Sequence, residues 1–207
     1  FARAPAGTRL QQFFKSPFPA LNHPRRAEDV ATDTVYADTA AIDNGATMAQ
    51  LYCGTTSTVT DVYGMKTEKQ FVNTLEDNIR ERGAMKRLLS DRAQVEMSTR
   101  VKDILRALFI GEWQSEPDHQ HQNPAERRIN TIKDTTNRLM DRVGAPAFTW
   151  LLALSYVCLV LNHIWNDTIG DVPLAMATGQ PVDISPIIRF TFWDRVLYRD
   201  GDESFPS

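Results

Sequence analysis

The segment WQSEPDHQHQNPAERRINTIKDTTNRLMDR, residues Trp113–Arg142, carries the strongest structural signal in the chain. Its first part is polar and turn-forming, and Pro124 suits the first turn of a helix, where a missing N–H would be unpaired in any case. From there the apolar residues step by three and four, which predicts a helix with one face packed on a core. Glu126, Asn130 and Lys133 step in the same way along an adjacent polar face. The segment therefore places a carboxylate in the first helical turn, with a lysine two turns further along the same side.

Two earlier segments carry further acidic residues. Asp91 stands in KRLLSDRAQVE, 35 positions before the glutamate (126 − 91 = 35). It directly follows Arg87–Ser90, which we interpret as a short buried strand. Asp33 and Asp38 stand in DVATDTVYADTAAID, where the alternation of Val30–Ala37 puts the first within a strand and the second at its end. Each acid alone is weak evidence, because an Asp at a strand end is commonly a turn residue and a Glu in a first helical turn commonly interacts with the helix dipole.

The remaining pattern predicts further strands and two more helices. Thr67 followed by Gln70 suggests a capping box that opens a helix, and Gly83 stands where such a helix should end. Ser98 suits the N-cap of a second helix. The segments that read as strands are Met48–Cys53, Val59–Met65 and Ile110–Trp113. Three strands joined by hairpins, followed by alternating helices and strands, favour a mixed sheet with helices on its faces.

The composition and charge of the chain limit the kinds of partner it can have, but they do not identify a function. The 207 residues carry a net charge of −3, which gives no overall signal for nucleic acid. Residues 1–26 hold five basic residues and no acid, so the remainder carries −8 (−3 − 5 = −8). A basic arm before an acidic body fits an enzyme that gathers metal ions at carboxylates and binds a polyanion through local patches, and a solvated basic linker explains it equally well.

One segment raises the question of a membrane. Trp150–Leu161 is a strongly apolar run of 12 residues without a charge. A spanning helix needs about 20 apolar residues, and runs of roughly 10–14 are more often core helices, so we expect no membrane span. Cys53 and Cys158 stand in apolar surroundings and are expected to be buried free thiols. The chain begins at Phe1 without a methionine, which predicts a piece of a longer polyprotein.

Taken together, the acidic motifs resemble the integrase catalytic core of retroviruses and long-terminal-repeat retrotransposons, most closely that of copia-like elements. That family carries Asp on its first strand, Asp after its fourth strand, and Glu on a helix at nearly the spacing found here. LLSDRAQ is similar to its strand and second Asp, HQNPAERRINTIK to the loop and helix that deliver its Glu, and GAPAFTWLLALSYVCLVLN to its next core helix. The resemblance covers roughly residues 28–170.

The resemblance implies an α/β, ribonuclease H-like fold, with a mixed five-stranded sheet flanked by helices and irregular N- and C-terminal extensions. The domain organisation that follows has three parts. Residues 1–29 form a basic, Pro-rich linker, residues 30–170 the integrase catalytic core, and residues 171–207 an irregular extension that ends in an incomplete β segment.

The activity implied is a DDE-type polynucleotidyl transfer, in which the 3′ ends of element DNA are processed by hydrolysis and then joined to target DNA by transesterification. Such chemistry uses two Mg²⁺ (or Mn²⁺) ions held by carboxylates from separate elements. The predicted catalytic and metal-binding residues are Asp33, Asp91 and Glu126. Asp38 is the alternative first Asp, and Asp33 is preferred because a metal ligand should stand on a rigid element.

The resemblance also implies partners. The predicted DNA-binding residues are Gln122, Asn123, Arg127, Asn130 and Lys133. The partners are then element ends and target DNA, family members act as multimers so a homo-oligomer is expected, and the protein acts in the nucleus after particle assembly in the cytoplasm. The alternative is a catalytically silent or domesticated integrase-like module that keeps the fold for DNA binding or assembly.

Overall fold

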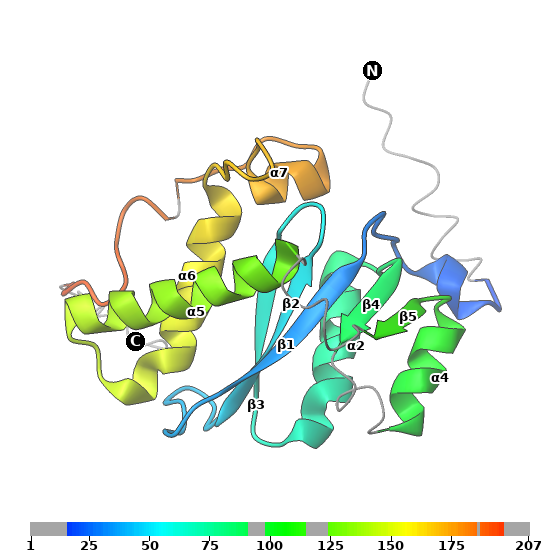
Figure 1. Ribbon diagram of the computed structural model, residues 1–207, viewed down its shortest axis with the longest axis horizontal. Helices are drawn as coiled ribbons and strands as arrows, with labels where there is room; N and C mark the ends of the chain where they lie inside the picture. The colour runs from blue at the N-terminus through cyan, green and yellow to red at the C-terminus, as the bar shows by residue number, and fades with distance from the viewer. Residues whose placement is uncertain (1–15, 91–97, 115–123, 186, 197–207) are drawn as a thin grey trace, which may run out of the picture.

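The computed structural model describes residues 16–90, 98–114, 124–185 and 187–196. Its centre is a five-stranded sheet in the order β3-β2-β1-β4-β5 (Figure 1). β1, β2 and β3 pair antiparallel, whereas β4 runs parallel to β1 and β5 parallel to β4. The predicted mixed sheet is confirmed, with strand ends shifted by at most one residue. The strands are β1 (Val30–Tyr36), β2 (Met48–Gly54), β3 (Thr60–Met65), β4 (Arg87–Ser90) and β5 (Gly111–Gln114).

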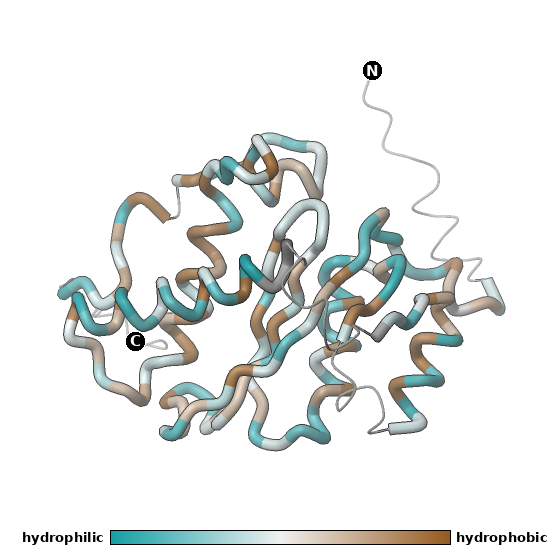
Figure 2. The backbone as a smooth tube through the Cα atoms, viewed as in Figure 1, coloured by the Kyte–Doolittle hydropathy of each residue, from teal (hydrophilic) through white to brown (hydrophobic). Residues whose placement is uncertain are grey.

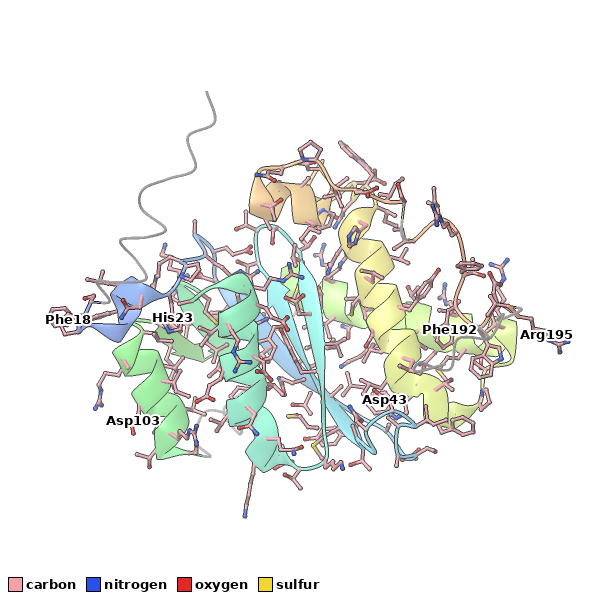
Figure 3. All side chains as sticks on the ribbon, turned by 180° about the vertical axis from the view of Figure 1, so that it is seen from behind. Phe18, His23, Asp43, Asp103, Phe192 and Arg195 are labelled. Carbon is pink, nitrogen blue, oxygen red and sulfur yellow. The ribbon has the colours of Figure 1, made fainter. Side chains whose placement is uncertain are left out.

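Helices cover both faces of this sheet. α5 (Pro124–Val143) crosses one face over β1 and β2, and α6 (Trp150–His163) packs beside it and against β3. α2 (Phe71–Arg82) and α4 (Thr99–Ala107) cover the opposite face, which is turned toward the viewer in Figure 3. Figure 2 shows hydrophobic residues running along most of α6, whereas α5 alternates between hydrophobic and hydrophilic residues. α5 is therefore the amphipathic helix that the sequence predicts.

Strand β2, which lies next to the central strand β1, contributes side chains to both cores, because successive side chains of a strand point to opposite faces. Leu51 and Cys53 are buried in the cluster that includes α5 and α6, and Tyr52 is buried in the cluster that includes α2 and α4. The fully buried Gln50 is satisfied by β1, since its amide oxygen accepts from the hydroxyl of Thr34 at 2.7 Å. A buried amide without such partners would destabilise the sheet.

Of the three predicted capping signals, the two at Ser98 and Gly83 are confirmed and the capping box is wrong. The hydroxyl of Ser98 accepts from the N–H of Val101 at 3.2 Å, as an N-cap should, and Gly83 ends α2 at φ +92°. The predicted capping box is wrong: Thr67 makes no cap hydrogen bond, and Gln70 accepts from the N–H of Lys66 at 2.6 Å. The reason is a 3₁₀ turn, η2 (Glu68–Gln70), which delays the start of the α-helix to Phe71.

The apolar run in α6 is a packed helix. Trp150, Leu151 and Leu154 are buried, whereas Leu152 and Leu159 are about two-fifths exposed. Burying each such side chain contributes roughly 1.5–3 kcal/mol. Within the described ranges, no helix has the length and hydropathy needed to cross a membrane.

Both cysteines are buried free thiols, as predicted. Burial raises the pKa of the Cys53 thiol to about 11 and that of Cys158 to about 12. Neither group is therefore a thiolate near neutral pH.

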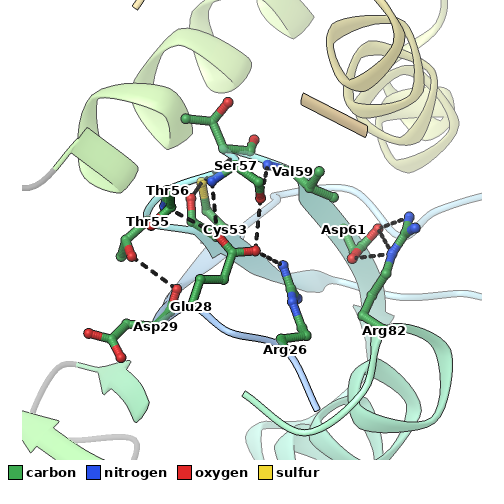
Figure 4. A network of polar contacts seen from close by, with 12 residues as sticks. Arg26, Glu28, Asp29, Cys53, Thr55, Thr56, Ser57, Val59, Asp61 and Arg82 are labelled. Atoms are coloured by element: carbon green, nitrogen blue, oxygen red, sulfur yellow. Dashed lines mark hydrogen bonds and ion pairs between the residues drawn. The ribbon is translucent and has the colours of Figure 1, made fainter. Parts of the chain in front are cut away.

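The described part of the predicted linker is docked on the body. The backbone of Pro24 and Arg26 exchanges hydrogen bonds with Ala84, and the N–H of Lys86 donates to the carbonyl of Glu28 at 2.9 Å. Glu28 accepts from the N–H of Ser57 at 2.8 Å and from the Arg26 guanidinium at 2.7 Å (Figure 4). Burial opposes the charge on Glu28, but these donors outweigh it and lower the pKa of the carboxyl.

The described part of the C-terminal extension is largely irregular. After the short helix α7 (Pro173–Thr178), residues 187–196 contain turns and irregular backbone, so the expected β segment is not present in this described part. The physical reason is a local turn. Asp194 accepts from both the N–H and the hydroxyl of Thr191 at 2.7 Å, which bends the chain where a strand would continue.

Candidate functional site

Asp33 stands in the middle of the central strand β1, on the face that α5 crosses. Its neighbours on the same side of the strand, Ala31 and Val35, pack in the core under α5 and α6, and Leu51 lies directly opposite on β2. Asp33 nevertheless keeps 37% of its side chain exposed. The carboxylate therefore lies on a rigid element and remains accessible from solvent.

Lys133 of α5 reaches this carboxylate. Its Nζ donates to Oδ2 of Asp33 at 2.5 Å, and a third of the lysine side chain is exposed. The sequence dictates this placement through the packing of the helix: Ile129 and Ile132 are buried in the core, which fixes the rotation of α5 about its axis and turns position 133 toward β1. The lysine predicted to contact DNA is thus paired with the acid predicted to hold metal.

The second predicted acid, Asp91, lies outside the described residues. The strand that leads to it is described: Val30 pairs with Leu88 and Ala31 with Leu89 in parallel register, and β4 ends at Ser90. Ala31 precedes Asp33 by two residues and Leu89 precedes Asp91 by two residues in the sequence.

The third acid, Glu126, is the third residue of α5, and its side chain is not among those described. Gln122 and Asn123 lie outside the described residues. Arg127 and Asn130, two of the residues predicted to bind DNA, are exposed on α5. The described side chains contain no group of three or more His, Cys, Asp or Glu that could bind a metal. The three-acid site therefore stays a prediction.

Asp38, the alternative first Asp, has different surroundings. It is exposed, two residues beyond the end of β1, and lines a groove of about 400 Å³ between β1, α5 and the start of α6. Trp150, Leu154 and Lys133 also line this groove. Lys133 pairs with Asp33 and not with Asp38.

Arg128 is the residue whose role the sequence did not reveal. Its Nη2 donates to the carbonyl of Leu161 near the end of α6 at 2.6 Å, and its Nε has no hydrogen-bond partner among the described residues. Burial lowers the pKa of the guanidinium. The available signal was helical spacing, since position 128 lies one turn before the buried Ile132.

The environment of Asp33 fits a cation. Its Oδ2 already holds a positively charged group, the Lys133 ammonium, and a carboxylate oxygen is the donor type that Mg²⁺ prefers. One carboxylate is not a metal site. A complete site needs the two acids whose side chains lie outside those described.

Known proteins match this chain in fold but not in sequence. No protein-family model matches the sequence, and no curated protein matches it. Solved structures do match: the catalytic core domain of BIV integrase aligns with a TM-score of 0.56 at 18% identity, covering 74% of this chain and 95% of that one. The fold is that of a retroviral integrase catalytic core. It is ribonuclease H-like, as predicted.

Two further structures support this fold. The HTLV-2 integrase catalytic core, solved with magnesium in a dimeric form, matches with a TM-score of 0.55 at 14% identity over 75% of this chain and 97% of that one. An intasome of simian T-cell lymphotropic virus, in complex with the PP2A regulatory subunit B56 gamma, matches with a TM-score of 0.59 at 14% identity. There the alignment covers 75% of this chain and 59% of the viral chain.

Proposed function

We propose that this chain is an integrase catalytic core, a metal-dependent enzyme that processes the 3′ ends of element DNA and joins them to target DNA. One observation carries the proposal: in an integrase-core fold, an accessible Asp33 stands mid-strand on β1, facing α5 and paired with a cation. The neighbouring strand β4 ends one residue before Asp91, and Glu126 is in the first turn of α5. The order of the three acids agrees with a shared site.

The residues would divide the work as follows. Asp33, Asp91 and Glu126 would hold two Mg²⁺ or Mn²⁺ ions, which when bound supply an activated nucleophile and relieve charge on the leaving oxygen. Lys133, Arg127 and the exposed Asn130 would hold and orient DNA, together with Gln122 and Asn123 in the preceding loop. A charged side chain near a phosphate neutralises it and strengthens binding.

The proposed context follows from the sequence motifs. The sequences of these motifs most resemble those of copia-like long-terminal-repeat retrotransposons, so we place the chain in a polyprotein of such an element. Its partners are then element ends and target DNA, and it acts as a homo-oligomer in the nucleus, after particle assembly in the cytoplasm. The dimeric HTLV-2 core and the viral intasome are the support for an assembled form.

A second candidate rests on the ion pair. Because Lys133 already neutralises Asp33, the pair is also what a catalytically silent module would keep as a structural contact between β1 and α5. Such a module would use the fold for DNA binding or assembly. Strand transfer separates the two candidates.

The experiment is a strand-transfer assay with element-end DNA, in Mg²⁺, on the wild type and matched variants. Asp33→Asn and Glu126→Gln keep side-chain size and remove one negative ligand, so each should lose at least about a hundredfold in rate, the scale of losing a charge partner in the transition state. Asp38→Asn makes the same chemical change five residues away and should retain activity. Loss in Asp38→Asn with activity kept in Asp33→Asn would reassign the first Asp. An inactive wild type would favour the silent module.

A further inference from the structure

The Asp33–Lys133 pair joins the two functions proposed for this face. The pair is accessible, since each side chain keeps about a third of its surface exposed. The helix that carries Lys133 is anchored on the body, because the neighbouring Ile132 is fully buried and Thr136, one turn further along, is buried as well. The backbone of Lys133 is therefore held in place, and only its flexible four-carbon side chain can move the ammonium.

The two cations compete for one oxygen. Nζ of Lys133 lies 2.5 Å from Oδ2 of Asp33, whereas Mg²⁺ binds carboxylate oxygen at about 2.0–2.1 Å. An ion on that oxygen places two positive charges close together around a single negative charge, and their repulsion outweighs what one carboxylate offers the ammonium. An ammonium displaced in this way needs another anion, and a phosphate oxygen suits a compact point charge.

We propose that Lys133 is a positioning residue that couples metal binding to DNA binding, an inference that rests on the proposed function. A divalent ion bound by Asp33 displaces the Lys133 ammonium, and the released ammonium binds a DNA phosphate. Metal binding thereby strengthens DNA binding. Because linkage is reciprocal, DNA strengthens metal binding by the same factor.

The metal half is tested without DNA and without activity. Mg²⁺ binding to the full chain is measured by titration calorimetry for the wild type, Lys133→Met and Arg138→Met. Arg138→Met is the control, because Arg138 is exposed on the same helix and its replacement removes the same charge. Lys133→Met should bind Mg²⁺ at least about fivefold tighter, the lower range of typical coupling between linked sites, with no comparable change in Arg138→Met. Equal affinities in the wild type and Lys133→Met would overturn the proposal.

The DNA half is tested by the salt dependence of binding to a short labelled duplex. In EDTA the wild type and Lys133→Met should have the same slope, because the ammonium is held by Asp33. In Mg²⁺ the wild-type slope should exceed that of the variant by about one unit, the value for one phosphate contact. Competition of Mg²⁺ for the DNA affects both proteins alike, so the difference between them is the measurement. If the slopes of the wild type and Lys133→Met differ equally in EDTA and in Mg²⁺, or differ in neither buffer, the coupling is contradicted.

Asp33→Asn provides the converse test, because it releases Lys133 without metal. In EDTA its slope should exceed that of the Asp33→Asn/Lys133→Met double variant by about one unit. Equal slopes would contradict the release. The strand-transfer assay distinguishes the coupling proposal from the proposed integrase activity. Strand transfer without coupling overturns only the coupling proposal, and coupling without strand transfer overturns only the proposed activity. Failure of the wild type to bind DNA in Mg²⁺ overturns both.

Discussion

At the scale of single residues, neighbouring arginines on α5 have opposite roles. Arg128 is partly buried and donates to the Leu161 carbonyl, whereas Arg127 is exposed. We predict that Arg128→Ala lowers the free energy of unfolding by about 1–3 kcal/mol, because it removes a partly buried, charge-assisted hydrogen bond to a helix carbonyl. Arg127→Ala should change it by less than about 0.5 kcal/mol. Urea unfolding of both variants measures these free energies. Equal losses of stability in the two variants would show that the Arg128 hydrogen bond does not stabilise the packing of α5 against α6.

At the scale of elements, Glu28 joins the segment before β1 to the β2–β3 hairpin through Ser57, and it pairs with Arg26 of its own segment. We predict that Glu28→Gln lowers the free energy of unfolding by about 1–3 kcal/mol at neutral pH, because an amide donor then faces the Ser57 N–H. The folded-state pKa of Glu28 is lowered from 4.5, so its stabilisation is present above that value and is lost as the pH falls through the folded pKa.

The measurement is urea unfolding of the wild type and Glu28→Gln between neutral and acidic pH. The difference between the two proteins should shrink once the pH falls below 4.5. A matched control is Glu68→Gln on the exposed η2 turn, which should stay close to the wild type throughout. A pH-independent difference would show that the charge of Glu28 contributes nothing.

At the scale of the whole molecule, the sequence was informative wherever the cause is local. Strand alternation gave the sheet to within one residue, and Ser98 and Gly83 marked helix ends because capping depends on neighbouring residues alone. Contacts between distant positions were not readable. Lys133 and Asp33 are 100 positions apart, and Arg128 and the Leu161 carbonyl are 33 apart, so helical periodicity placed each residue on a face without naming its partner.

The start of the folding unit also depends on contacts between distant positions, which local sequence features do not reveal. Proline content and positive charge made residues 1–29 read as a linker, but three successive residues of its end, Pro24 to Arg26, hold distant parts of the body. Arg25 donates to the carbonyls of Leu108 and Phe109 at the end of α4, while Pro24 and Arg26 pair with Ala84 before β4. The unit that folds therefore begins before β1.

We accordingly predict that a chain starting at residue 30 is less stable than one starting at residue 16 by more than about 3 kcal/mol. The shorter chain leaves the carbonyls after α4 and the backbone of Ala84 without their donors and acceptors, and it removes the buried Arg26–Glu28 pair. Thermal and urea unfolding of the two chains measure the difference, with the 207-residue chain as the reference. If the chain from residue 30 unfolds at the same urea concentration as the other two, the segment before β1 is a linker after all.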